Sequence, residues 1–163
     1  HNVYGKSKEK GENYLSVAGK PHLAIRTTIL GKNLNLKKIG FLEWMINSIK
    51  VGEKITLFED VIFTPITIWN LCDELDWIIK NKISGTVNIA SNEAISKYDL
   101  GMIICKRMGL DFSLINKGSF RDYSFKAKRA KDQSLDSGNY FKLSNRQKIS
   151  IDNVVESILK NFN

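Results

Sequence analysis

The chain has 163 residues, of which 42% are hydrophobic and 26% are charged, and its formal net charge is +8. These proportions predict a soluble globular protein that is long enough to bury a sizeable core. No apolar run approaches the roughly 20 residues that a membrane-spanning helix needs, and the start carries no signal-peptide pattern. Cys72 and Cys105 form no metal-ligand spacing, so they predict a reduced, cytoplasmic protein without a metal site.

The positive charge is concentrated between residues 117 and 148. This stretch contains nine basic and three acidic residues, which gives it a net charge of +6. Such a segment suits an anionic partner, either a nucleotide diphosphate or a nucleic acid. A lysine-rich solvated surface would have the same composition. The charge by itself therefore does not distinguish a binding segment from an ordinary surface.

Tyr4 and Lys8 stand four residues apart at the start of the chain. The pattern predicts a helix over residues 3–18 with Asn2 as its N-cap, and a spacing of four puts both side chains on one face. A nearby ammonium favours the ionised form of a phenol, which suits a tyrosine to proton exchange with a carbonyl or an alcohol. On spacing alone, however, an ordinary solvated helix face explains the pair better.

The longer string is more specific: residues 4–8 read Tyr-Gly-Lys-Ser-Lys, and Gly11-Glu12 follow. This resembles the catalytic helix of the extended short-chain dehydrogenase/reductase family, and within it the dTDP-4-dehydrorhamnose reductase branch. The resemblance implies that Tyr4 is the general acid/base. It also implies that Lys8 holds the nicotinamide ribose and favours the Tyr4 phenolate, with NADPH or NADH as the cofactor.

A short apolar run at residues 22–31 is rich in β-branched side chains and ends in glycine, which predicts a buried strand. The run resembles the Arg-Thr-Ser strand of the same reductases, whose C-terminal end faces the cofactor. By that resemblance Thr27 and Thr28 are candidate cofactor contacts. Arg26 is a charge inside an apolar run, so it predicts an ion-pair partner or a surface position.

Helical and strand patterns alternate along the rest of the chain. Apolar spacing and capping residues predict helices at 37–50, 67–80 and 97–108, and a last helix capped by Ser150. β-branched runs predict strands at 55–58, 85–90 and 112–115. The segments at 59–67 and 84–100 resemble segments of the same reductases in the same order. The predicted fold is therefore α/β, the C-terminal part of a Rossmann-type doubly wound parallel sheet with a smaller α/β substrate-binding lobe.

The basic stretch contains a string, residues 129–136, that resembles the Arg-Pro-x-x-Ser-x-Leu-Asp of these reductases, with Ala130 in place of proline. In extended members of the family, an arginine of this lobe often meets the diphosphate of the sugar nucleotide. A guanidinium fork suits phosphate oxygens. Arg129 is therefore the candidate substrate-binding residue, and a nucleotide-linked sugar is the implied substrate.

A reductase of this family needs a glycine-rich phosphate turn after its first strand, and no such turn occurs here. We therefore expect the C-terminal part of a longer reductase. Residues 1–35 would end its dinucleotide-binding domain, and residues 36–163 would form the remainder of the sheet together with the substrate-binding lobe. The missing N-terminal half of the same polypeptide would then be a partner, and a homodimer stays open.

Three functions remain open at the level of sequence. The first is a reductase, or a related epimerase or dehydratase, that acts on a nucleotide-linked keto sugar. The second is a non-catalytic regulatory or binding subunit of the same fold, which the intact Tyr4 and Lys8 pair disfavours. The third is a small basic nucleic-acid-binding domain, which has aromatic residues among its basic ones but no RNA-binding motif.

Overall fold

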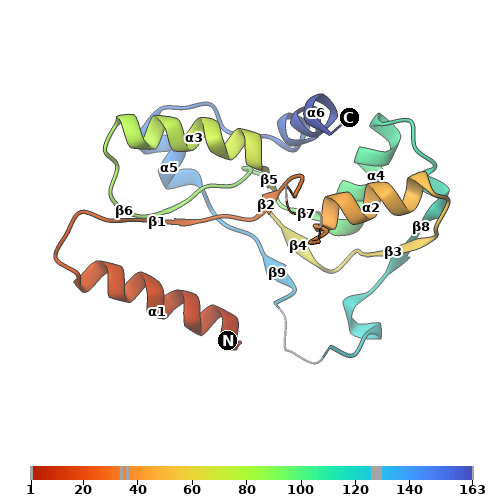
Figure 1. Ribbon diagram of the computed structural model, residues 1–163, viewed down its shortest axis with the longest axis horizontal. Helices are drawn as coiled ribbons and strands as arrows, with labels where there is room; N and C mark the ends of the chain where they lie inside the picture. Colours follow the sequence, from red (N-terminus) through yellow and green to blue (C-terminus); the bar gives the residue numbers. More distant parts are fainter. Residues whose placement is uncertain (1, 34, 36, 126–129, 163) are drawn as a thin grey trace.

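The computed structural model describes residues 2–33, 35, 37–125 and 130–162, and Figure 1 shows how they are arranged. The helices are α1 (Val3–Val17), α2 (Phe41–Lys50), α3 (Ile68–Lys80), α4 (Lys97–Arg107), α5 (Gly138–Ser144) and α6 (Ile151–Asn161), with the 3-10 turns η1 (Phe112–Leu114) and η2 (Phe120–Asp122). The strands are β1 (Leu23–Arg26), β2 (Ile29–Leu30), β3 (Ile55–Phe58), β4 (Ile62–Phe63), β5 (Ile66–Thr67), β6 (Gly85–Asn88), β7 (Ile95–Ser96), β8 (Ile115–Gly118) and β9 (Asp132–Gln133).

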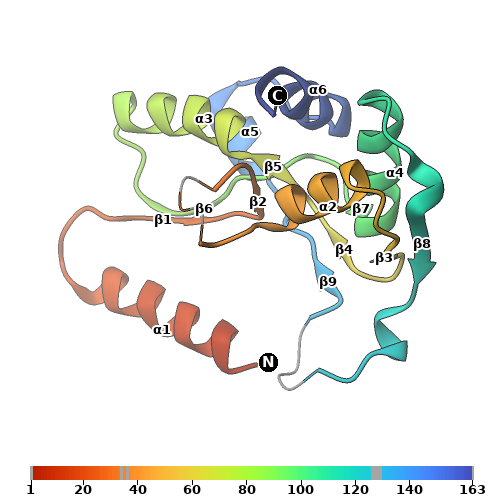
Figure 2. The same cartoon turned by 45° about the vertical axis from the view of Figure 1, so that its right-hand side comes forward.

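Parallel pairing dominates the sheets. Strand β1 pairs with β6, β2 with β5 and β3 with β8, all in parallel, while β4 lies between antiparallel β7 and parallel β9. Parallel strands need crossover connections, which place helices over the faces of the sheet. Figures 1 and 2 both show α3 on one side of β1 and β6 and α1 on the other. This arrangement confirms the predicted α/β class.

The run at residues 22–31 is two short strands, so the prediction of one continuous strand was wrong. The chain leaves β6 at the end of β1 and joins β5 at the start of β2. Thr28 makes this crossing: its hydroxyl donates to the carbonyl oxygen of Thr64, and its own carbonyl accepts from the Ile66 amide at 3.1 Å. The two threonines predicted to face a cofactor therefore form the connection between β1 and β2.

Two other predicted boundaries were wrong for local reasons. Helix α2 begins at Phe41, not at residue 37, because the Glu43 carboxylate accepts from the Gly40 amide at 2.9 Å and fixes the first turn there. Residues 112–114 of the predicted strand at 112–115 form η1, because the Asp111 carboxylate accepts from the Ser113 amide at 3.0 Å, and only Ile115 belongs to a strand. Strand β8 starts only where that turn ends.

The predicted caps of the later helices are confirmed. The Ser96 hydroxyl accepts from the Asp99 amide at 2.9 Å at the start of α4, and the Ser150 hydroxyl accepts from the Asn153 amide at 3.1 Å at the start of α6. Each cap satisfies a backbone donor that the helix itself leaves unpaired. Helices α2, α4 and α6 then contribute to one hydrophobic core, with fully buried side chains from all three.

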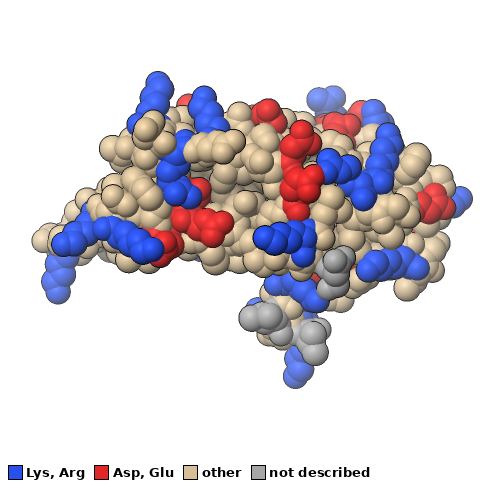
Figure 3. Space-filling model, turned by 90° about the horizontal axis from the view of Figure 1, so that it is seen from above, with Lys and Arg blue, Asp and Glu red and all other residues tan. Residues whose placement is uncertain are grey.

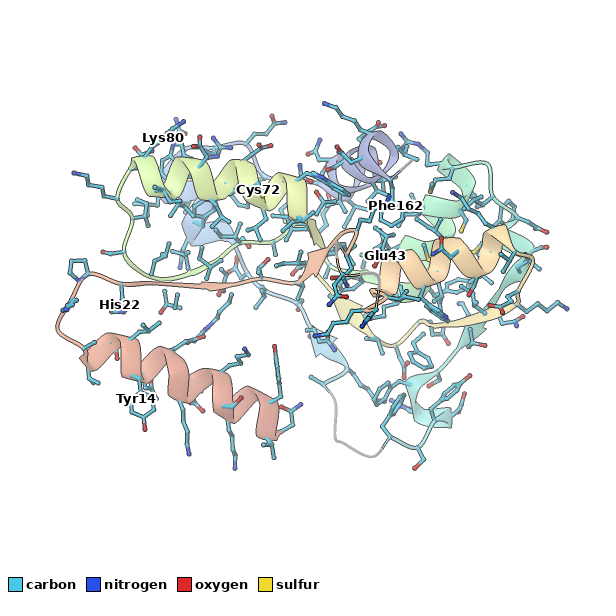
Figure 4. All side chains as sticks on the ribbon, in the orientation of Figure 1. Tyr14, His22, Glu43, Cys72, Lys80 and Phe162 are labelled. Carbon is cyan, nitrogen blue, oxygen red and sulfur yellow. The ribbon has the colours of Figure 1, made fainter. Side chains whose placement is uncertain are left out.

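Helix α1 differs from the others, because none of its described residues is buried. Val3, Tyr14 and Val17 are each more than 70% exposed, and Figure 4 shows Tyr14 on the side of α1 that faces away from β1. Within the described residues, no helix combines the length and apolar character needed to cross a membrane. An ion pair between Arg26 and Glu12, which is described below, joins α1 to β1.

Candidate functional site

Tyr4 and Lys8 lie on the first two turns of α1. The predicted N-cap is confirmed, since the Asn2 side chain accepts from the Gly5 amide at 2.8 Å. The Lys8 Nζ lies 5.4 Å from the centroid of the Tyr4 ring, so the two side chains are in contact as the spacing predicts. The Tyr4 side chain is 70% exposed, which leaves its hydroxyl accessible from outside α1.

A cleft of about 680 Å³ lies beside Tyr4, and we call it the Tyr4 cleft. Its wall includes Tyr4 from α1 and Thr27 and Thr28 from the connection between β1 and β2. The other described lining residues are Asn2, Gly5, Ile29, Leu30, Phe41, Phe63, Lys97, Ala130 and Gln133. The structure therefore brings three of the predicted site residues together, with Lys8 against Tyr4, while Arg129 lies outside the described residues.

The two threonines have different surroundings. The Thr28 hydroxyl is engaged with the Thr64 carbonyl. The Thr27 Oγ1 is buried and, among the described residues, has no hydrogen-bond partner. A buried hydroxyl left unpaired costs about 1–3 kcal/mol. An orphaned hydroxyl in the wall of a cleft fits a polar group that comes from a ligand or from chain beyond the described residues.

Arg26 connects α1 to the strand that leads into Thr27. Its Nε donates to Glu12 Oε1 at 2.9 Å and its Nη2 donates to Glu12 Oε2 at 2.5 Å. The expected ion-pair partner of Arg26 is thus found, and it belongs to the Gly-Glu end of the first motif. These hydrogen bonds hold the pKa of the Glu12 carboxyl below its usual range and raise the pKa of Arg26.

A second cavity, of about 220 Å³, adjoins the Tyr4 cleft and shares Phe41, Lys97, Ala130 and Gln133 with it. Its other described lining residues are Trp44, Thr56, Leu57, Phe58, Val61, Phe120 and Phe125. The Phe120 and Phe125 rings are stacked at 4.4 Å, and Phe58 meets Phe120 edge to face at 5.8 Å. We call this cavity the aromatic pocket.

Asp60 positions the aromatic side of this pocket. Its carboxylate accepts from the Phe120 amide at 2.7 Å and from the Ser119 hydroxyl at 2.9 Å, and it pairs with Lys131 at 3.5 Å. These contacts lower the pKa of Asp60, with the Phe120 amide as the largest cause. One carboxylate therefore joins the end of β3 to η2 and to the segment before β9.

Several residues of the cleft were missed by sequence reasoning. Lys97 lines both cavities, and its Nζ lies 4.4 Å from the centroid of the Phe41 ring and 5.6 Å from that of Phe63. Lys97 stands inside the Ser-x-Tyr-Asp segment, whose family resemblance was the available signal. Phe63 lies on β4, and no motif or spacing in the sequence singled it out.

The basic stretch at 117–148 does not form a uniform positive surface. Lys117 pairs with Glu59 at 2.8 Å and Arg146 with Glu74 at 2.6 Å, in addition to the Lys131 pair. Helix α5 lies inside the stretch and buries Tyr140 and Phe141. On the face that Figure 3 shows, lysine and arginine side chains are interspersed with carboxylates. The ion pairs and the buried side chains indicate that residues 117–148 belong to a folded lobe and do not favour a continuous basic surface for nucleic acid.

A larger cavity, of about 960 Å³, lies on the α3 and α6 side of the molecule. Its described lining contains neither Tyr4 nor the two threonines, and it includes residues such as Trp69, Glu74 and Lys160. Glu74 is already bonded there to Arg146 and to the Tyr140 hydroxyl. We therefore place the candidate site at the Tyr4 cleft and not at the larger cavity.

The parallel pairs, the helices on both sides and a Tyr-x-x-x-Lys helix beside the end of β1 define a Rossmann-type α/β protein. The sequence profile of one family, described as the RmlD substrate binding domain, matches residues 1–163. The chain belongs to that family. The resemblance to the sugar-nucleotide reductase branch is thereby confirmed.

Known proteins show the same relationship. The chain is 29% identical over 140 residues to the "probable low-salt glycan biosynthesis reductase Agl14" of Haloferax volcanii, covering 83% of this chain and 46% of that protein. The dTDP-4-dehydrorhamnose reductase of Bacillus anthracis, solved in complex with NADP, superposes with a TM-score of 0.86 at 21% identity, over 97% of this chain and 55% of that one. The dTDP-4-dehydrorhamnose reductase ortholog from Clostridium acetobutylicum superposes with a TM-score of 0.81 at 23% identity, over 96% of this chain and 55% of that one. The chain thus spans about half the length of these relatives.

Proposed function

We propose that this chain is the C-terminal part of an NAD(P)-dependent reductase that acts on a nucleotide-linked keto sugar. The observation that carries the proposal is the single cleft shared by Tyr4, Thr27 and Thr28, with Lys8 against the Tyr4 ring. Membership of the RmlD substrate binding domain family supports the substrate class. In this proposal residues 1–35 end the dinucleotide-binding domain and residues 36–163 complete the sheet and the substrate lobe.

Tyr4 would pass the proton in the reaction. Tyr4 is exposed and lines a cleft large enough for part of a substrate, and a tyrosine next to a lysine suits proton transfer to a sugar oxygen. Lys8 would hold the ribose of the cofactor and keep Tyr4 in place. The proposal keeps Arg129 as a contact for the substrate diphosphate, by family resemblance alone.

NADPH or NADH is the cofactor that these residues would hold, and a related reductase is known in complex with NADP. When bound, a nicotinamide cofactor supplies or accepts a hydride at the sugar carbon. The orphaned Thr27 hydroxyl, together with Thr28, Tyr4 and Lys8, offers polar groups at one end of the cleft for such a ligand. The residues present therefore fit the cofactor.

The test is Tyr4→Phe in the protein that carries both halves, with Tyr14→Phe as the matched control on the same helix. Tyr14 is 74% exposed and lies on the far side of α1. We expect turnover to fall by about 10²–10⁴-fold in Tyr4→Phe, because a positioned acid/base contributes that much, with cofactor affinity nearly unchanged. Unchanged turnover in Tyr4→Phe would show that Tyr4 is not the proton donor, whereas an absence of turnover in the unmutated protein would favour the non-catalytic subunit.

Cofactor stoichiometry separates the reductase from an epimerase or dehydratase of the same fold. A reductase consumes one NAD(P)H for each sugar converted, whereas the other two regenerate their cofactor within each turnover. Absorbance of the reduced nicotinamide, measured alongside product by NMR, gives this ratio. A ratio near zero with full conversion of the sugar would contradict the reductase and favour the alternative.

A further inference from the structure

Lys97 lies at the junction between the Tyr4 cleft and the aromatic pocket, and it lines both. It is the first residue of α4. The N-cap residue Ser96 fixes the start of the helix, and the Lys97 amide donates to the Val61 carbonyl at 3.1 Å. The side chain is half-buried, with its Nζ 4.4 Å from the centroid of the Phe41 ring. Its position is therefore set by backbone and ring contacts from several elements.

The local electrostatics favour an anion at this junction. The first turn of a helix carries a partial positive charge, which disfavours a cation there and attracts negative groups. A half-buried ammonium that lines both cavities, at the start of a helix, suits a negatively charged ligand group.

The aromatic pocket, Lys97 and the Tyr4 cleft follow one another in an order that can be compared with the parts of a sugar nucleotide. Stacked aromatic rings lie on one side of Lys97, and Tyr4 with the two threonines lies on the other. A sugar nucleotide has its parts in the same order, with a planar base at one end, a diphosphate in the middle and a sugar at the other end. Aromatic side chains suit a base, and a lysine suits phosphate.

We propose that Lys97 binds the diphosphate of the substrate and so sets the sugar at Tyr4 and the base in the aromatic pocket. The inference rests on the proposed function, because it takes a nucleotide-linked sugar as the substrate. It adds a substrate-binding residue that the motifs did not identify.

The test is calorimetry on the protein that carries both halves, with dTDP, UDP and NADPH as ligands. The variants are Lys97→Met, which removes the charge, and Lys97→Arg, which keeps it. Lys106→Met is the matched control, since Lys106 also lies on α4 over a phenylalanine ring, at 5.3 Å from Phe112. We expect Lys97→Met to weaken the nucleoside diphosphate that the wild type prefers by about ten- to hundredfold. The affinity of Lys97→Arg and of Lys106→Met for that diphosphate should stay within about threefold of wild type. The NADPH affinity of Lys97→Met should also stay within about threefold.

The outcomes separate the inference from the function beneath it. If the wild type binds dTDP or UDP and Lys97→Met binds it equally well, the role of Lys97 is wrong while the proposed substrate class stands. If Lys97→Met loses NADPH affinity to the same extent, Lys97 serves the fold or the cofactor, and the inference is wrong. If the wild type binds neither diphosphate, the proposed substrate class is wrong and the inference falls with it.

Discussion

Arg26 on β1 and Glu12 on α1 form a bidentate ion pair, in which Nε and Nη2 of the arginine donate to the two carboxylate oxygens at 2.9 and 2.5 Å. Glu12 lies two turns after Tyr4, and Arg26 immediately precedes Thr27. The pair therefore joins the helix that carries the candidate acid/base to the strand that leads into the candidate cofactor contacts. Because none of the described residues of α1 is buried, we expect this pair to contribute to the placement of Tyr4 beside the cleft.

The first prediction is that Glu12→Gln loosens α1. The Glu12 and Arg26 side chains are 23% and 52% exposed, and exposed ion pairs contribute about 1 kcal/mol or less. Opening of α1 should thus become up to about fivefold more frequent. Hydrogen exchange of the α1 amides in the protein with both halves measures this, with Lys10→Gln as a control on the same helix. Equal exchange in both variants would contradict the role of the pair.

The second prediction concerns pH. The Arg26 hydrogen bonds lower the pKa of Glu12 in the folded state, so its stabilising contribution is present above the unfolded glutamate pKa of about 4.3. That contribution is lost as the pH falls through the lower folded pKa. Protection of the α1 amides, corrected for intrinsic exchange, should therefore drop in acid below about pH 4 in the wild type. The drop should be smaller in Glu12→Gln, and an identical acid profile for the two proteins would refute the link.

The third prediction is that Thr27→Val weakens cofactor binding without destabilising the free protein. The Thr27 hydroxyl is buried without a partner among the described residues, so removing it frees the apo protein of that cost. A hydrogen bond to the bound cofactor would contribute about 0.5–1.5 kcal/mol, or about two- to tenfold in affinity. NADPH titration and thermal unfolding give the two readouts. Unchanged NADPH affinity would show that the hydroxyl serves another partner.

A matched control for Thr27→Val is Thr86→Val on β6, the strand that pairs with β1. Thr86 is exposed and lies outside both cavities, so this exchange should leave NADPH affinity unchanged. A similar loss of affinity in both variants would point to a general effect on the β1 and β6 pair and not to the Thr27 hydroxyl.

How far the sequence predicts this molecule depends on the range of the interactions involved. The caps at Ser96 and Ser150 were predictable, because a cap is decided within four residues. The break at Thr28 was not, because it depends on the exchange of β6 for β5 as partner, strands that come far later in the chain. The motifs could likewise nominate Tyr4 and the threonines as candidates, whereas the place of Lys97 between two cavities became visible only in three dimensions.

The last prediction concerns the Glu74, Tyr140 and Arg146 network behind the sheet. Glu74 is 4% exposed and accepts from the Tyr140 hydroxyl at 2.6 Å and from Arg146 at 2.6 and 3.0 Å. Burial, followed by the Glu74 contact, raises the pKa of Tyr140, so the phenol stays neutral and keeps donating. Tyr140 therefore depends on the Glu74 carboxylate for a buried hydrogen bond, and Arg146 depends on it for two partly buried ones.

Glu74→Gln should lower the free energy of unfolding by about 2–3 kcal/mol, less than for a fully buried pair because the Arg146 side chain is 32% exposed. Tyr140→Phe, which removes one neutral donor, should cost about 1–2 kcal/mol and serves if the first variant does not fold. Asp76→Asn is the control on the same helix, since the Asp76 and Lys80 pair is exposed and should contribute at most about 0.5 kcal/mol. Urea unfolding of the protein with both halves measures all three. Equal midpoints for Glu74→Gln and Asp76→Asn would mean that the buried network adds no more stability than a surface ion pair.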